Sequence, residues 1–104
     1  MKTKGFIGLG IMGFPMAGHI SKVHPTFVYN RSPSKSHHWT DTYTGNVAES
    51  PEDLGISCEE IFICVGDDDD VREVIAGNKG LINTMQPGGI IAVSYTHLTL
   101  PTKA

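Results

Sequence analysis

Several features that would mark a specialised protein are scarce in this sequence. Of the 104 residues only 8% are aromatic, two are cysteine, and the formal net charge is -3. The two cysteines, Cys58 and Cys64, are too few for a disulfide framework and lack the spacing of a metal knuckle, so we expect a reducing, cytoplasmic compartment. The absence of a basic excess argues against a nucleic-acid partner. Because no apolar stretch approaches the ~20 residues that span a bilayer, we also expect no membrane association.

The most informative feature present is the run Gly8-Leu9-Gly10-Ile11-Met12-Gly13. It follows an apolar strand predicted over residues 3–7 and precedes a helix predicted over residues 11–21, which is the context that gives a glycine triplet its meaning. The first glycine permits a tight turn, the second lets backbone approach a pyrophosphate, and the third lets the helix pack closely on the strand. The helix N-terminus would then hold the phosphates through its N–H groups. These six residues predict a dinucleotide-binding site, in preference to a glycine-rich turn without a ligand.

The rest of the sequence alternates between predicted strands and helices. Further strands are predicted over residues 26–30, 46–48, 60–65 and 89–93. Helices are predicted over 34–43 with Ser34 as the cap, from Ser50 and Pro51 onward, and over 68–76. Strands and helices of this length in alternation imply right-handed crossovers. We therefore expect an α/β fold with a Rossmann-like, doubly wound parallel sheet, incomplete at about five strands.

The segment after the second predicted strand indicates which dinucleotide is bound. In dinucleotide-binding folds an acidic residue at this place binds the ribose 2′-hydroxyl of NAD, whereas an arginine accommodates the 2′-phosphate of NADP. Here the residues are Asn30, Arg31 and Ser32, followed by Lys35. A guanidinium offers a phosphate two charge-assisted hydrogen bonds, so the sequence predicts NADP(H) rather than NAD(H). The alternative is a solvated arginine on a turn.

No metal or catalytic constellation is predicted from the remaining polar residues. Four consecutive carboxylates, residues 67–70, cannot all face one ion, and at a helix start they favour capping of exposed N–H groups. The five histidines show no metal-ligand spacing. No partner for a nucleophile lies in a recognisable context.

Three segments together resemble the β-hydroxyacid dehydrogenases, the family of 3-hydroxyisobutyrate dehydrogenase and tartronate semialdehyde reductase, related to 6-phosphogluconate dehydrogenase. Residues 5–20 (GFIGLGIMGFPMAGHI) are similar to the family's cofactor signature, residues 29–35 (YNRSPSK) to its NADP-using members, and residues 64–71 (CVGDDDDV) to the loop after its fourth strand. The resemblance implies that Val65 and the backbone near Gly66 border the nicotinamide. It also implies hydride transfer between NADP(H) and a small 3-hydroxy acid, in a parent enzyme that forms a homo-oligomer.

The resemblance ends near residue 92, and this divides the sequence into two parts. Residues 1–92 are predicted to be a partial dinucleotide-binding domain without the family's catalytic lysine or its C-terminal helical domain. Residues 93–102 can be encoded, codon by codon, by a transposon-end sequencing adapter, so we expect residues 93–104 to be non-native. We therefore expect no turnover from this chain alone. Two alternatives stay open: a 6-phosphogluconate dehydrogenase-like enzyme or imine reductase, and a non-catalytic dinucleotide-binding module.

Overall fold

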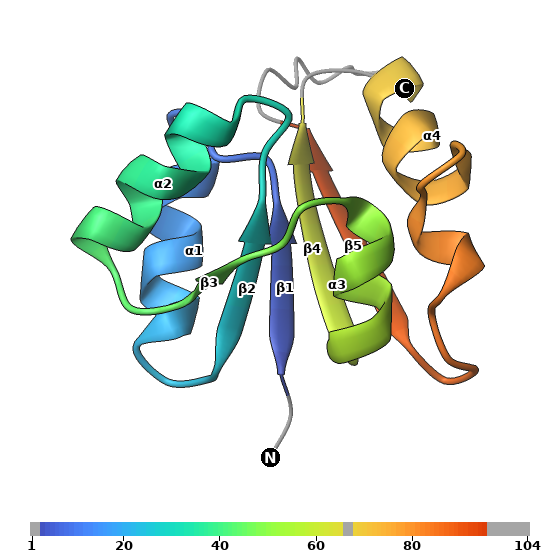
Figure 1. Ribbon diagram of the computed structural model, residues 1–104, viewed down its shortest axis with the longest axis horizontal. Coiled ribbons are helices and arrows are strands. Elements are labelled where there is room, and N and C mark those ends of the chain that lie inside the picture. Colours follow the sequence, from blue (N-terminus) through green and yellow to red (C-terminus); the bar gives the residue numbers. More distant parts are fainter. Residues whose placement is uncertain (1–2, 66–67, 96–104) are drawn as a thin grey trace, which may run out of the picture.

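A computed structural model of the protein describes residues 3–65 and 68–95, and it contains one parallel β-sheet (Figure 1). The five strands lie in the order β3-β2-β1-β4-β5. Their bounds are β1 Lys4–Ile7, β2 Thr26–Tyr29, β3 Asn46–Val47, β4 Glu60–Val65 and β5 Ile90–Tyr95. All four strand pairs are parallel. The predicted α/β class and the Rossmann-like sheet are confirmed.

The helices connect successive strands, as the sequence predicts. They are α1 Gly13–Ser21, α2 Pro33–Thr42, α3 Pro51–Ser57 and α4 Asp68–Ala76, and a 3₁₀ turn, η1 Leu81–Asn83, precedes β5. The start of α3 matches the sequence prediction, because the Ser50 side chain accepts a hydrogen bond from the Asp53 N–H at 3.4 Å and Pro51 occupies the first position. The turn η1 has no counterpart among the predicted elements.

Two predicted helix starts are wrong by one or two residues. The first helix begins at Gly13 rather than at residue 11, because the preceding residues are still turning around the glycine loop. The second begins at Pro33, with Ser32 rather than Ser34 in the capping position, and the Ser32 side chain makes no capping bond. Proline has the backbone angle of a helix already fixed, so it can start one without a side-chain cap.

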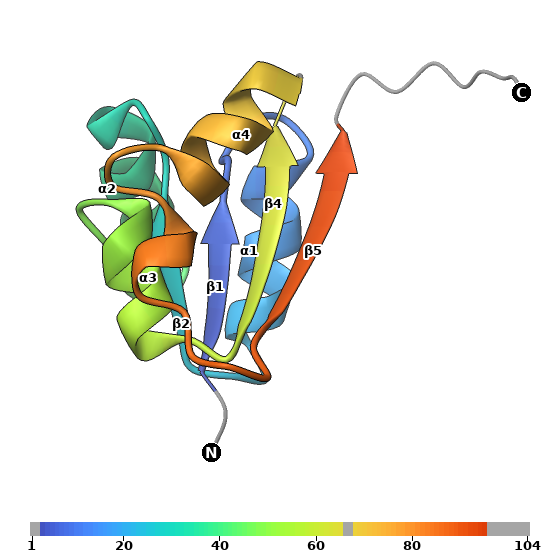
Figure 2. The ribbon, with the colours of Figure 1, turned by 90° about the vertical axis from the view of Figure 1, so that its right-hand side faces the viewer.

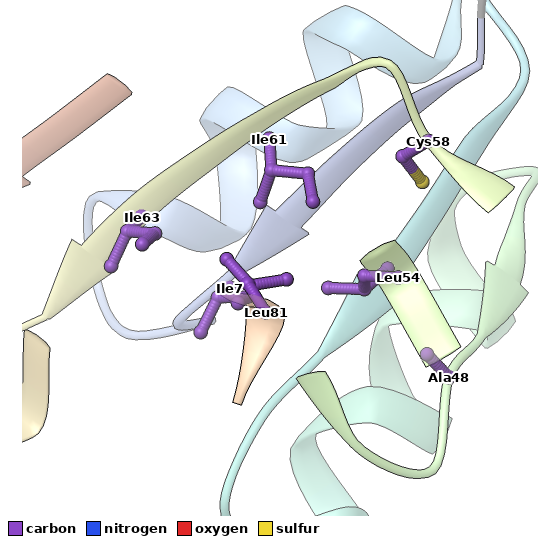
Figure 3. Close-up of a cluster of buried hydrophobic side chains, with 7 residues drawn as sticks. All are labelled: Ile7, Ala48, Leu54, Cys58, Ile61, Ile63 and Leu81. Carbon is purple, nitrogen blue, oxygen red and sulfur yellow. The ribbon is translucent and has the colours of Figure 1, made fainter. Parts of the chain in front are cut away.

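Side chains on the two faces of the sheet form two separate hydrophobic clusters. One cluster lies under α1 and α2 and contains Phe6, Leu9, Ala17, Val28, Trp39 and Cys64. The other lies under α3 and η1 and contains Ile7, Ala48, Leu54, Cys58, Ile61, Ile63 and Leu81 (Figure 3). Neighbouring residues of a strand belong to different clusters because strand side chains alternate between faces. This burial on both faces is what the unbroken apolar run of β4 predicts.

Within residues 3–65 and 68–95, strand β5 forms one edge of the sheet and pairs with β4 alone (Figure 2). Its Ile90 and Val93 side chains are 54% and 41% exposed. The strand ends at Tyr95, two residues beyond the predicted end, so its last residues belong to the segment expected to be non-native. Ladder pairing uses backbone groups, and valine and tyrosine both favour strands, so this pairing is compatible with either origin of the segment.

Candidate functional site

A cleft of about 950 Å³ lies at the carboxyl ends of β1 and β2, beside α4. The strand order reverses between β1 and β4, which is where open parallel sheets bind ligands. Eight of the residues predicted to bind a cofactor line this cleft: Gly8, Gly10, Ile11, Met12, Asn30, Arg31, Ser32 and Lys35. The folded chain therefore brings together the two sequence segments, around residues 8–13 and 30–35, that were assigned to one site.

The three glycines of the loop have three different surroundings. Gly8 has a φ of 99°, which side chains rarely tolerate, and its N–H donates to the Tyr29 carbonyl at 3.0 Å. A Cβ on Gly13 would lie 1.9 Å from the Gly8 carbonyl oxygen, so α1 can pack here only without a side chain. A Cβ on Gly10 would meet nothing within 4 Å. It would instead project into open space, where a pyrophosphate would approach the backbone.

The start of α1 offers donors to this space. The first hydrogen bonds back from the helix are made by the Phe14 N–H to the Gly10 carbonyl at 2.9 Å and by the Met16 N–H to the Met12 carbonyl at 3.3 Å. Within the described residues, the N–H groups of Ile11, Met12 and Gly13 have no backbone acceptor. The first turn also carries no acidic side chain to neutralise the positive end of the helix dipole. The loop thus fits a phosphate group on geometry and on charge.

Leu9 and Gly13, which the sequence also predicts to bind the cofactor, are not among the residues that line the cleft. The Leu9 side chain is 2% exposed and packs in the cluster beneath the loop. Its N–H points the other way and donates to the Asn30 side-chain oxygen at 2.8 Å. The Asn30 amide nitrogen in turn donates to the Ser32 carbonyl at 3.2 Å. Asn30 therefore joins the glycine loop to the turn after β2 and fixes their relative position.

Arg31 and Lys35 place positive charge at the mouth of the cleft. Both side chains are exposed, and the Arg31 side chain is 77% accessible to solvent. The Arg31 guanidinium donates a hydrogen bond to the carboxylate of Asp70 on α4, forming an ion pair. The turn after β2 carries no carboxylate of its own, since Asn30 stands where NAD-specific sites have an acid.

Sequence reasoning missed the far wall of the cleft. This wall is formed by Glu49, Ser50 and Pro51 after β3, by Asp70, Glu73 and Val74 of α4, and by Asn78 and Lys79. The residues after β3 could have been found, because the carboxyl ends of parallel strands meet at one edge of a sheet. The contribution of α4 depends on how closely that helix approaches β2, and no local pattern encodes this distance.

The acidic run, and Val65 and Gly66, which the family resemblance predicts to border the nicotinamide, are only partly described. Strand β4 ends at Val65, whose side chain lies outside the described residues, as do Gly66 and Asp67. Capping by the first carboxylates therefore stays a prediction. Asp69 lies 3.8 Å from Arg72 in a pair on the helix surface, while Asp70 contacts Arg31.

Neither cysteine is set up as a nucleophile. Burial raises the pKa of the Cys58 thiol to about 11 and also raises the pKa of Cys64, which borders the cleft. Both side chains behave as small hydrophobic groups of the core. Among the described residues, no group of three or more histidine, cysteine, aspartate or glutamate side chains could hold a metal ion. In the same part of the chain, no helix has the length and apolar character needed to cross a membrane.

Comparison with known proteins identifies the family. Residues 3–102 match the family described as the NAD binding domain of 6-phosphogluconate dehydrogenase. The chain belongs to this family. This membership confirms the resemblance predicted from the sequence.

Individual relatives of this family agree with the match. An uncharacterized oxidoreductase of Shewanella frigidimarina is 45% identical over 92 residues, covering 88% of this chain and 32% of the relative. An Arabidopsis thaliana protein named "Probable 3-hydroxyisobutyrate dehydrogenase-like 2, mitochondrial" is 37% identical, covering 86% of this chain and 30% of the relative. Among solved structures, Psf3 in complex with NADP⁺ and 2-OPP is 26% identical with a TM-score of 0.77, covering 89% and 33%. The chain thus spans about a third of the length of these proteins.

Proposed function

We propose that this chain is the NADP(H)-binding part of an oxidoreductase that transfers a hydride between the nicotinamide and a small 3-hydroxy acid. The observation that carries the cofactor choice is that Arg31, on the turn after β2, and Lys35, in α2, both line the cleft, while the turn itself has no carboxylate. A carboxylate at this place would repel a 2′-phosphate, whereas a guanidinium binds it. The solved complex of Psf3 with NADP⁺ supports the same choice for a related cofactor domain.

Different residues of the cleft bind different parts of the cofactor. The N–H groups at the start of α1 hold the diphosphate, above the space left open by Gly10. Arg31 binds the 2′-phosphate, with Lys35 as a second cation. The apolar side chains of Pro51 and Val74 also line the cleft and suit the adenine. By family resemblance, Val65 would border the nicotinamide, which would supply or accept the hydride when bound.

The substrate class rests on the relatives rather than on this cleft. The Arabidopsis thaliana relative is named a 3-hydroxyisobutyrate dehydrogenase-like protein, which supports a small 3-hydroxy acid as the substrate of the whole enzyme. We propose that the whole enzyme is a cytoplasmic homo-oligomer. No residue of the described cleft is assigned as the acid or base for the hydroxyl proton, so we expect this chain alone to bind cofactor without turnover.

Calorimetric titration of the purified chain with NADP⁺ and with NAD⁺ tests this proposal. We expect NADP⁺ to bind more tightly, by about tenfold, which corresponds to about 1.4 kcal/mol and is close to the lower end of the roughly 1.5–3 kcal/mol typical of hydrogen bonds to charged groups. R31Q should remove most of that preference. The matched control is R72Q, because Arg72 is a similarly exposed arginine, at 79%, that does not line the cleft. Binding of NAD⁺ at least as tightly as NADP⁺ would refute the cofactor assignment.

A further inference from the structure

An ion pair spans the mouth of the cleft. Arg31 belongs to the turn after β2 and Asp70 to α4, and both side chains line the cavity. The two residues are 39 positions apart in the sequence, so only the fold brings them together. The Asp70 side chain is 32% exposed and that of Arg31 is 77% exposed, which leaves the pair open to solvent and to an arriving ligand.

The carboxylate competes with a phosphate for the same guanidinium. Arg31 already donates to Asp70 through one terminal nitrogen, and a 2′-phosphate binds an arginine best when it can use two parallel N–H groups. The Asp70 charge also cancels that of Arg31 and repels a phosphate dianion at short range. For a ligand with a free 2′-hydroxyl neither effect arises, because no second anion approaches the arginine.

We propose that Asp70 is a specificity-determining residue that weakens binding of 2′-phosphorylated adenine nucleotides and so moderates the preference for NADP(H) over NAD(H). This inference rests on the proposed function, because it assumes that the adenosine end of the cofactor lies beside Arg31. Asp70 acts here through Arg31 and through its own charge. The strength of the discrimination is then set by two residues, one on each side of the cleft.

The size of the effect follows from the exposure of the pair. Ion pairs between exposed side chains contribute at most about 1 kcal/mol, which corresponds to a factor of about 5 in affinity. D70N keeps the shape of the side chain and removes its charge. We expect D70N to bind adenosine 2′,5′-bisphosphate about 2- to 5-fold more tightly than the unsubstituted chain.

Two ligands and two variants isolate this effect. Adenosine 2′,5′-bisphosphate and 5′-AMP differ only in the 2′-phosphate, and D70N should leave the affinity for 5′-AMP within about twofold. The control D69N removes the same charge from the same helix, at a side chain that is 93% exposed and does not line the cleft. It should change neither affinity. In an R31Q background, D70N should lose the part of its effect that comes from competition for the guanidinium and keep only the direct repulsion between Asp70 and the phosphate, so the gain in affinity should be smaller.

The outcomes separate this inference from the proposed function. Unchanged or weaker binding of adenosine 2′,5′-bisphosphate by D70N would overturn the inference, since Asp70 would then be neutral or would hold Arg31 in its binding position. An equal gain in D69N would overturn it as well, because the effect would be one of overall charge. Titration of the unsubstituted chain with NADP⁺ and NAD⁺ compares the two affinities and so tests the proposed function independently of Asp70. Thermal melting of each variant without ligand verifies that it is folded.

Discussion

Replacing Gly10 and Gly13 one at a time by alanine should separate the folding role of the glycine loop from its binding role. The two positions are three residues apart and receive the same added methyl group. At Gly13 the new carbon would lie 1.9 Å from the Gly8 carbonyl oxygen, which is backbone and cannot rotate away. At Gly10 it would meet nothing within 4 Å. Neither residue has a positive φ, so alanine can adopt the backbone angles of both.

From the structure we expect G13A to lose stability, and G10A to keep its stability but to lose affinity for NADP⁺. In G13A the loop and α1 must separate, and overpacking of this kind costs about 1–3 kcal/mol. For a domain of about 100 residues that lowers the melting temperature by about 4–8 °C per kcal/mol. In G10A the free energy of unfolding should change by less than about 1 kcal/mol, and any change should be stabilising, because alanine restricts the unfolded chain. The methyl group should nevertheless weaken NADP⁺ binding at least tenfold, since it occupies the approach to the diphosphate.

Two measurements on the same samples test this pair. Differential scanning calorimetry without ligand reports the melting temperature, and isothermal titration with NADP⁺ reports the affinity. We expect G13A to melt well below the unsubstituted chain and G10A to melt with it while losing affinity. If G10A bound NADP⁺ as tightly as the unsubstituted chain, the diphosphate could not lie on this loop, and the assigned site would be wrong.

Four further predictions concern stability, activity and the end of the sequence. Burial raises the pKa of Cys58 to about 11 from the ordinary 9.0, so between pH 9 and 11 this thiol ionises in the unfolded chain but not in the folded one. The free energy of unfolding should therefore fall as the pH rises through this range. Urea titrations should show a shallower fall in C58A. N30A removes the acceptor of the Leu9 N–H and should lower the free energy of unfolding in urea by about 1–3 kcal/mol. N30D keeps the acceptor and serves as a control. N46A changes an exposed asparagine of β3 and should lower the free energy of unfolding by less than about 0.5 kcal/mol. Spectrophotometry at 340 nm should detect no NADP⁺ reduction by this chain with any 3-hydroxy acid, because no residue of the described cleft is assigned as the acid or base for the hydroxyl proton, and sustained turnover would contradict this expectation. Sequencing the locus from intact source DNA should give a different continuation after residue 92, whereas the same residues 93–104 followed by a stop codon would show that they are native.

The order and type of the elements were predictable from local patterns. The apolar run of β4 predicts burial on both faces, and both clusters receive its side chains. The Ser50-Pro51 start of α3 was also found, because a cap and a first-position proline act within one turn. The start of α1 was missed, since the glycine run allows several places at which a turn becomes a helix. The start of α2 was missed because Pro33 begins it without a capping side chain.

The candidate site was predictable where it follows a motif and unpredictable where it depends on packing. The glycine loop and Arg31 are marked by their positions after strands, and they do line one cleft. The bond from the Leu9 N–H to Asn30 joins residues 21 positions apart, and the Arg31 pair with Asp70 joins residues 39 apart. Such contacts depend on how strands and helices are placed side by side. Local reasoning interprets the acidic run as a helix cap, and the contact of its Asp70 with Arg31 is visible only in the folded chain.

The most direct test of the central claim is a nuclear magnetic resonance titration of the ¹⁵N-labelled chain with NADP⁺. The account predicts that the largest changes in amide chemical shift fall on residues 8–13 and on Arg31, Ser32 and Lys35, at the carboxyl end of the sheet. The same titration with NAD⁺ should move residues 8–13 with smaller changes at Arg31. Changes confined to the opposite end of the sheet, around Lys4, His19 and Glu60, would contradict the account.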